Sequence, residues 1–170
     1  YKRFIRSGAL LKGSDKDRYS NINQEISKLS VQFSQNLLAE TNNFEVILSK
    51  DDLKGLPEDI INLAKEEADN KYKKTSDVKY SDKYIFTTHR SSMYPFLTYS
   101  ERRDLREKLY TGYIMRGDNN NEYDNKNITS KIASLRVEKA NILGFDTHAH
   151  YVLDNTCLLY TSPSPRDSDS

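Results

Sequence analysis

The sequence predicts a mainly α-helical protein with one small two-stranded β element. In several long segments, apolar residues recur every three or four positions, which is the spacing of one face of an α-helix. Two short runs of apolar, aromatic and β-branched residues, 44–48 and 84–87, are typical of strands. Several predicted apolar faces have no obvious partner within the chain, so we expect an incomplete part of a larger helical fold.

The longest predicted helix spans residues 14–42. Ser14 is a suitable N-cap, and Asp15 favours the positive end of the helix dipole. The pair Asn42-Asn43 is a natural place for the helix to end. Its apolar face consists of Ile22, Ile26, Leu29, Phe33 and Leu37.

A strand over residues 44–48 and a helix beginning at Pro57 follow. Proline suits the first helical position because its missing N–H would be unpaired there anyway. The apolar face of this helix consists of Ile60, Leu63, Ala64 and Ala68. The polar segment 71–82 is expected to be a mobile loop, and the second strand, 84–87, could pair with the first.

A further helix is predicted over residues 100–116, with Gly117 just past its end as a C-cap. Three apolar residues spaced four apart define its face: Leu105, Leu109 and Tyr113. The Asn-rich segment 118–127 is interpreted as a connection.

The helix predicted over residues 127–143 carries two apolar stripes, which suggests burial on two sides. The stripes consist of Ile128, Ile132, Leu135 and Ile142, and of Ala133, Val137 and Ala140. Gly144 is expected to end this helix, and residues 147–153 are expected to begin another.

Charge and composition exclude several classes of function. The chain has 26 basic and 25 acidic residues, a net charge of +1, and both signs are spread along its length. This pattern lacks the basic patch that nucleic acid or an anionic membrane would require. No apolar run reaches the roughly 18 residues of a membrane-spanning helix. We therefore expect no nucleic-acid partner and no membrane partner.

The only cysteine is Cys157, so the residues before it offer no disulfide framework and no thiolate metal site. This composition favours a cytoplasmic protein. The periplasm is the alternative, because the sequence begins at Tyr1 and a signal peptide could precede it.

We find no pattern that indicates catalysis, cofactor binding or metal binding. The HExxH zinc signature, the Gly-x-Ser-x-Gly elbow and the Gly-rich phosphate loops are all absent from the sequence. Of the three histidines, His148 and His150 are placed on a helix, where side chains two apart diverge, and His89 stands alone. We interpret them as surface or partly buried imidazoles. No catalytic, cofactor-binding or metal-binding residue is predicted.

Four segments carry a resemblance to a known family. They are 4–11 (FIRSGALL) with the helix ending at 33–41; 52–59 (DLKGLPED); 92–97 running into 103–110 and 116–117; and 135–145 (LRVEKANILGF). In this order they resemble the zinc metallopeptidases of the thimet oligopeptidase family, most closely its bacterial peptidyl-dipeptidase branch. The resemblance covers about residues 4–155. Arg102 and Ser91 stand where the family often has Asn and Pro, and we interpret both as surface or turn changes.

The resemblance implies that residues 1–156 are a fragment from the N-terminal helical half of a zinc-dependent oligopeptidase, where they provide scaffold and part of a substrate-channel wall. The catalytic half, with HExxH and the zinc, would follow downstream, so this chain would be catalytically incompetent by itself. The implied partners are the remainder of the polypeptide and, for the whole protein, short peptides as substrate. The alternative is a free-standing helical protein-interaction module, and an HExxH further along the reading frame would discriminate between the two.

The segment 157–170 differs from the rest of the chain. Residues 157–167 (CLLYTSPSPRD) resemble a common transposase-based sequencing adapter translated in frame; the alternative is a natural Ser/Pro-rich linker. The segment has no apolar periodicity, so we expect a disordered tail and exclude it from the interpretation of fold and function.

Overall fold

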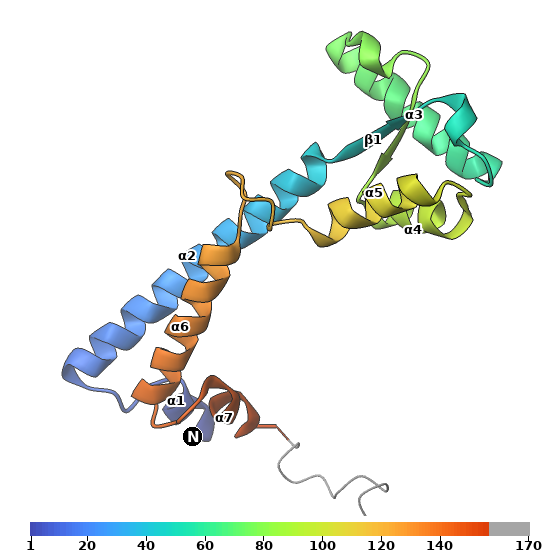
Figure 1. The fold of residues 1–170 in the computed structure, drawn as a ribbon. Helices are drawn as coiled ribbons and strands as arrows, with labels where there is room; N and C mark the ends of the chain where they lie inside the picture. The colour runs from blue at the N-terminus through green and yellow to red at the C-terminus, as the bar shows by residue number, and fades with distance from the viewer. Residues whose placement is uncertain (157–170) are drawn as a thin grey trace, which may run out of the picture. The chain divides into compact units, whose positions relative to one another are not determined.

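The structure is a computed structural model that describes residues 1–156, apart from the side chains of residues 2 and 3 (Figure 1). The expected disordered tail, 157–170, lies outside the described residues. Seven α-helices and one two-stranded sheet confirm the mainly helical prediction. The helices are α1 Lys2–Arg6, α2 Gly13–Asn43, α3 Glu58–Thr75, α4 Arg90–Tyr99, α5 Arg103–Ile114, α6 Lys126–Ile142 and α7 His148–Leu153; the strands are β1 Glu45–Leu48 and β2 Tyr84–Thr87; and two 3₁₀ turns cover Lys50–Asp52 and Val78–Tyr80.

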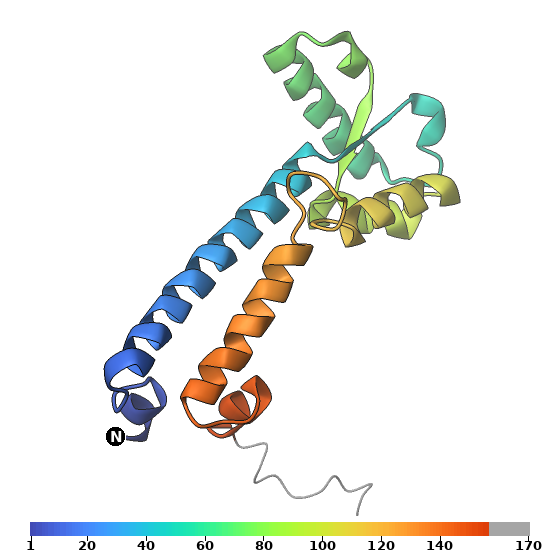
Figure 2. The ribbon, with the colours of Figure 1, turned by 60° about the vertical axis from the view of Figure 1, so that its left-hand side comes forward.

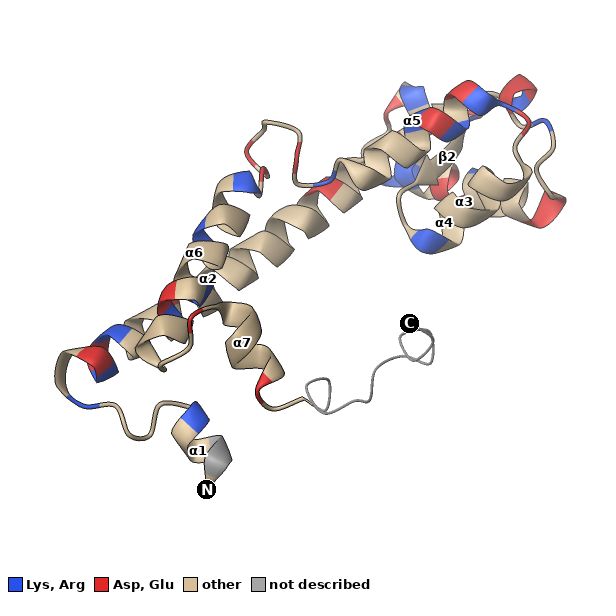
Figure 3. Cartoon of the chain, turned by 60° about the horizontal axis from the view of Figure 1, so that its bottom comes forward, with Lys and Arg blue, Asp and Glu red and all other residues tan. Residues whose placement is uncertain are grey.

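The chain divides into two compact units, which are described separately. The first contains residues 1–32 and the chain from residue 127 onward, and the second contains residues 33–126. None of the helices within residues 1–156 is long and apolar enough to cross a membrane. Basic and acidic residues are interspersed along the helices of both units (Figure 3).

In the first unit, the N-terminal part of α2 lies antiparallel to α6 (Figures 1 and 2). Ile22 is buried on α2, and Leu135 on α6. Arg18 and Glu138 form a two-bond ion pair, with N–O distances of 2.5 and 2.7 Å. The predicted second stripe of α6 is buried only in part, since Ala140 is fully buried, whereas Val137 is 46% exposed and Ala133 is exposed. The prediction of burial on two sides therefore holds for the first stripe and for one residue of the second.

In the second unit, β1 and β2 pair antiparallel, as predicted, with Glu45 opposite Thr87 and Leu48 opposite Tyr84. The core packs against this pair, and the Phe86 and Phe96 rings lie 4.5 Å apart. Its buried members are Val46, Leu48, Leu53, Leu56, Ala64, Phe86, Met93, Phe96 and Leu109. Both strands and the helices α3, α4 and α5 thus contribute to one apolar cluster, which positions α5 relative to the sheet.

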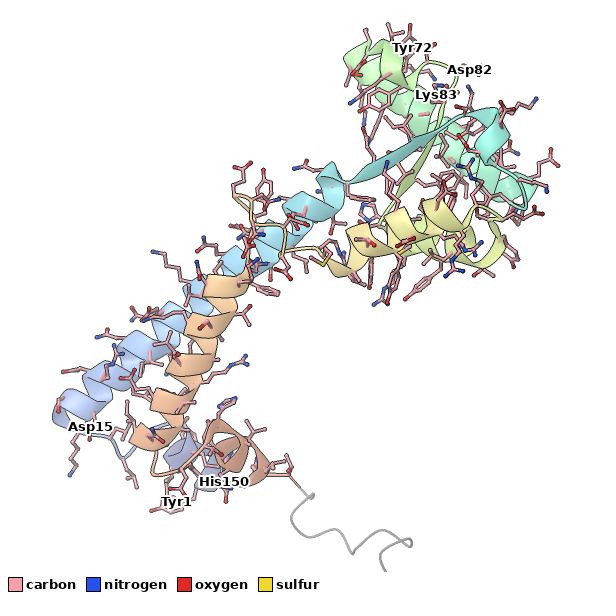
Figure 4. The ribbon with its side chains drawn as sticks, in the orientation of Figure 1. Tyr1, Asp15, Tyr72, Asp82, Lys83 and His150 are labelled. Atoms are coloured by element: carbon pink, nitrogen blue, oxygen red, sulfur yellow. The ribbon has the colours of Figure 1, made fainter. Side chains whose placement is uncertain are left out.

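The prediction of a loop over residues 71–82 is wrong in its first part, because α3 continues to Thr75. Lys71, on the last turns of α3, pairs with Glu45 at 2.5 Å, and the buried Tyr80 donates its hydroxyl to Glu45 at 2.9 Å. A solvated helix face has the same polar composition as a loop, so composition alone misplaced this boundary. Tyr72 lies near the end of α3, and the remaining turn contains Asp82 and Lys83 (Figure 4).

Two helices and one contact were not predicted. The short helix α1 was missed, and so was α4, which contains Pro95 and buries Met93 and Phe96. Arg102 is more than a surface change, because it bonds Asp52 at 2.5 Å and Asp104 at 2.7 and 3.0 Å. The hydrogen bonds from Arg102 lower the pKa of Asp104 to about 2. This guanidinium ties the first 3₁₀ turn to the start of α5.

Candidate functional site

The three histidines do not assemble into a site. His89 is the exposed N-cap of α4 in the second unit. His148 and His150 lie on α7 in the first unit (His150 is labelled in Figure 4), as predicted. Burial lowers the pKa of His148, and the charges of Arg136 and Lys139 lower it further. Within residues 1–156, no group of three or more His, Cys, Asp or Glu side chains could hold a metal ion.

We expect the purified chain to bind zinc no more tightly than scattered surface imidazoles do. A structural zinc site contributes an apparent ~10–16 kcal/mol at neutral pH, and it needs about four converging ligands. Calorimetric titration with zinc should therefore give a weak, non-stoichiometric isotherm, and replacing His148 and His150 together by Asn should leave it unchanged. A tight one-to-one site, lost in the double variant, would contradict the expectation.

A hollow of about 580 Å³ lies in the second unit between the end of α2, one face of α5 and the loop that follows α5. Its lining is Glu40, Asn43, Phe44, Lys108, Thr111, Gly112, Met115, Arg116, Asn119, Asn121 and Tyr123. One wall consists of residues 108, 111 and 112 of α5 and of residues 115 and 116, which directly follow the helix. Residues spaced three and four apart lie on one face of a helix, so the side chains of this segment line a single wall.

Gly112 allows α5 to approach the end of α2. A Cβ atom at Gly112 would lie 2.1 Å from two carbons of the Phe44 ring, far inside van der Waals contact. Any larger residue would push this ring or the helix away. The hydrogen atom of glycine is thus what sets the distance between these two walls of the hollow.

Glu40 is the buried charge of this hollow, with 6% of its surface exposed. Its carboxylate accepts hydrogen bonds from the Gly117 N–H, from the Asn119 amide at 3.0 and 3.1 Å, and from the Asn121 amide at 2.6 Å. Burial raises the pKa of Glu40, but the hydrogen bonds outweigh it and the pKa lies below its ordinary value. The carboxylate is therefore ionised at neutral pH, and donors satisfy both of its oxygens.

The loop between α5 and α6 is held in place by this carboxylate and by a buried amide. Gly117 has a φ of +78°, a conformation that glycine adopts without steric cost. The buried Asn125 donates its backbone N–H to the Gly117 carbonyl at 2.7 Å and its side-chain amide to Phe33 O at 3.1 Å. It also accepts a hydrogen bond from the Asn36 amide at 3.0 Å. The segment predicted as a plain connection is thus a specific, hydrogen-bonded structure.

Two cations line the hollow without a carboxylate partner among residues 1–156. The Arg116 guanidinium donates to the Tyr113 carbonyl at 2.8 Å and to the Thr41 hydroxyl at 3.0 Å, and it lies 4.1 Å from the centre of the Tyr113 ring. Lys108 is exposed. With Glu40 already bonded, the hollow is suited to binding an anion, and it contains no nucleophile paired with a base.

Sequence reasoning named none of these residues as a site. Glu40 and Arg116 fall inside segments quoted for the family resemblance, yet neither belongs to a motif with a known spacing. The donors to Glu40 follow it by 77 to 81 residues, and no local pattern connects positions so far apart. The run of Asn residues after Gly117 was the one available signal.

Comparison with known proteins shows similarity to one group. The model of peptidase family M3 matches residues 96–157. Oligopeptidase A of Haemophilus influenzae is 36% identical over 155 residues, which is 88% of this chain and 22% of the relative. The probable cytosolic oligopeptidase A of Arabidopsis thaliana is 32% identical over 149 residues, 87% of this chain and 21% of the relative.

A dipeptidyl carboxypeptidase of Escherichia coli is 29% identical over 150 residues, 88% of this chain and 21% of the relative. The chain thus spans about a fifth of the length of these curated relatives. The similarity runs through both units of the structure, not through one motif.

Proposed function

Because this chain belongs to peptidase family M3, we propose that it serves as scaffold and as part of the substrate-channel wall of a zinc-dependent oligopeptidase. One observation carries the proposal: 88% of the chain aligns with a fifth of an oligopeptidase A. The described residues do not fit a zinc site. In this proposal, the metal and the groups that cleave the peptide belong to other parts of the polypeptide.

Exposed apolar side chains support the proposed docking onto the remainder of the polypeptide. Val31 and Leu38 on α2 are each 57% exposed, and Val137 is exposed on α6. Side chains of this kind on amphipathic helices are normally covered by another element. We propose that the rest of the peptidase covers them, and that short peptides are the substrate of the whole protein.

The compartment proposed for the whole protein is the cytoplasm. The support is the name of one Arabidopsis relative, a probable cytosolic enzyme. A second relative from the same plant is named as organellar.

The proposal is tested by determining the coding sequence downstream of this segment in its source genome. An HExxH motif should follow in the same reading frame, and the longer product should cleave short peptides. Removing metal with 1,10-phenanthroline should abolish cleavage, and added zinc should restore it. A reading frame that ends without HExxH would contradict the peptidase assignment and favour a free-standing interaction module.

The proposed role in the wall of the substrate channel is tested by a separate cross-linking measurement. A non-cleavable peptide with a photoreactive benzophenone group should label residues of 1–156 in the longer product, and excess substrate should compete with the labelling. Labelling confined to other parts of the polypeptide would overturn the wall role and leave the peptidase assignment standing.

A further inference from the structure

We infer that the hollow beside Glu40 binds an organic carboxylate that carries an apolar group, with Lys108 and Arg116 as its anion-binding residues. The inference is independent of the zinc reaction and of the wall role, because it rests on the second unit alone. The ligand class covers the carboxyl end of a short peptide and a free organic acid.

The hollow has the volume of a small-molecule site. Its volume of about 580 Å³ lies within the roughly 300–1,000 Å³ typical of ligand pockets. Its walls come from three segments of one compact unit. The Phe44 ring lies close against Gly112, and hydrogen bonds hold the loop wall. The walls are therefore preformed, which reduces the entropy that a ligand must offset.

The charges of the hollow favour an anion. Of the five N–H donors of a guanidinium, Arg116 commits one to Tyr113 and one to Thr41. Lys108, on α5, lines the same hollow, and the described residues place no carboxylate within ion-pair distance of either cation. Two cations against one carboxylate leave the lining with a net positive charge.

Glu40 keeps its charge inside the hollow. Its charge is stabilised by its own donors, so it persists at neutral pH and repels a negative group placed next to it. Charge alone does not favour a carboxylate over phosphate, because the attraction to Lys108 and Arg116 grows with the charge of the ligand as the repulsion from Glu40 does. The planar guanidinium matches the geometry of both anions, so the apolar part of the lining has to distinguish them.

The apolar part of the lining defines the rest of the ligand. Phe44 and Met115 flank Gly112 in the hollow, and Tyr123 contributes an aromatic ring. An aromatic or aliphatic group attached to the carboxylate would bury apolar surface there. A bare inorganic anion would leave this surface in water.

The inference is tested with N-acetyl-phenylalanine as the probe and its neutral carboxamide as the isostere. Titrating the ¹⁵N-labelled chain with the acid should give saturable NMR shifts at the amides of Gly112, Asn119 and Asn121. The carboxamide should bind at least about tenfold more weakly, the loss expected when one charge-assisted hydrogen bond is removed. Inorganic phosphate should also bind at least about tenfold more weakly, because it has no apolar group to bury. A tripeptide acid that ends in phenylalanine should bind more tightly than the amino acid if the natural ligand is a peptide end, and no more tightly if it is a free organic acid.

The variants Lys108→Gln and Arg116→Gln should each weaken binding of the acid by about tenfold or more. Lys73→Gln, an exposed lysine of α3, is the matched control and should change nothing. Lys108 is exposed, so its substitution tests the site even if Arg116→Gln fails to fold. Equal binding of acid and carboxamide, equal binding of phosphate, absence of saturable shifts, or unchanged affinity of Lys108→Gln would each overturn the inference.

Discussion

Replacing Glu40 by Gln should lower the free energy of unfolding by about 3 kcal/mol. The carboxylate accepts four hydrogen bonds from Gly117, Asn119 and Asn121. A glutamine would turn an N–H₂ group toward at least one of these donors. Hydrogen bonds to a charged group contribute about 1.5–3 kcal/mol each, and an unsatisfied buried donor costs about 1–3 kcal/mol. Urea denaturation followed by circular dichroism measures the change.

The effect of Glu40 should depend on pH in a defined direction. Its pKa in the folded state lies below the ordinary value of 4.5, so folding favours the ionised form. The stabilisation is fully present above pH 4.5 and is lost as pH falls through the lowered folded pKa. The difference between wild type and Glu40→Gln should therefore be constant near pH 7 and shrink toward pH 3.

The matched control for this substitution is Glu66→Gln. Glu66 is exposed on α3, and exposed substitutions usually change stability by no more than about 0.5 kcal/mol. If Glu40→Gln fell within that range, or if its effect grew toward acid pH, the Glu40 carboxylate would not be what holds the Asn-rich loop.

Replacing Gly112 by Ala should destabilise the chain by about 2 kcal/mol, although alanine is the better helix former by about 1 kcal/mol. The added methyl carbon would lie 2.1 Å from the Phe44 ring, and overpacking of this kind typically costs about 1–3 kcal/mol, occasionally more. Equilibrium unfolding in urea provides the measurement. The neighbouring exposed position, Thr111→Ala, is the control and should stay within about 0.5 kcal/mol of wild type.

A double-mutant cycle with Phe44→Ala separates the clash from any general effect of the glycine. Once the ring is removed, Gly112→Ala should become neutral or stabilising by up to about 1 kcal/mol, because only the gain in helix propensity remains. A Gly112→Ala cost that is the same with and without the Phe44 ring would show that the close approach of α5 and α2 does not depend on this contact.

Elements with a strong periodic signal could be predicted from the sequence. The long helix α2 and the strands β1 and β2 were placed to within two residues at each end. The spacing of apolar residues along one face is a local property, so a single sequence displays it. The helix α4 was missed, since Pro95 inside a ten-residue element hides the helical pattern, and the burial of Met93 and Phe96, which stabilises the helix, is a tertiary property.

The sequence by itself determined the family and most of the helices and strands of this protein, because ordered motifs and apolar periodicity are properties of neighbouring residues. Only the tertiary structure decided where the hollow lies and how Glu40 is held. The hollow is lined by Glu40 and Asn43 at the end of α2, by Phe44 just after it, and by residues between positions 108 and 123. These segments meet because the core between them folds the chain back. Whether Glu40 is an exposed helix residue or a buried, fully bonded carboxylate depends on how these two segments pack together. The spacing of residues along the sequence carries no information about that packing.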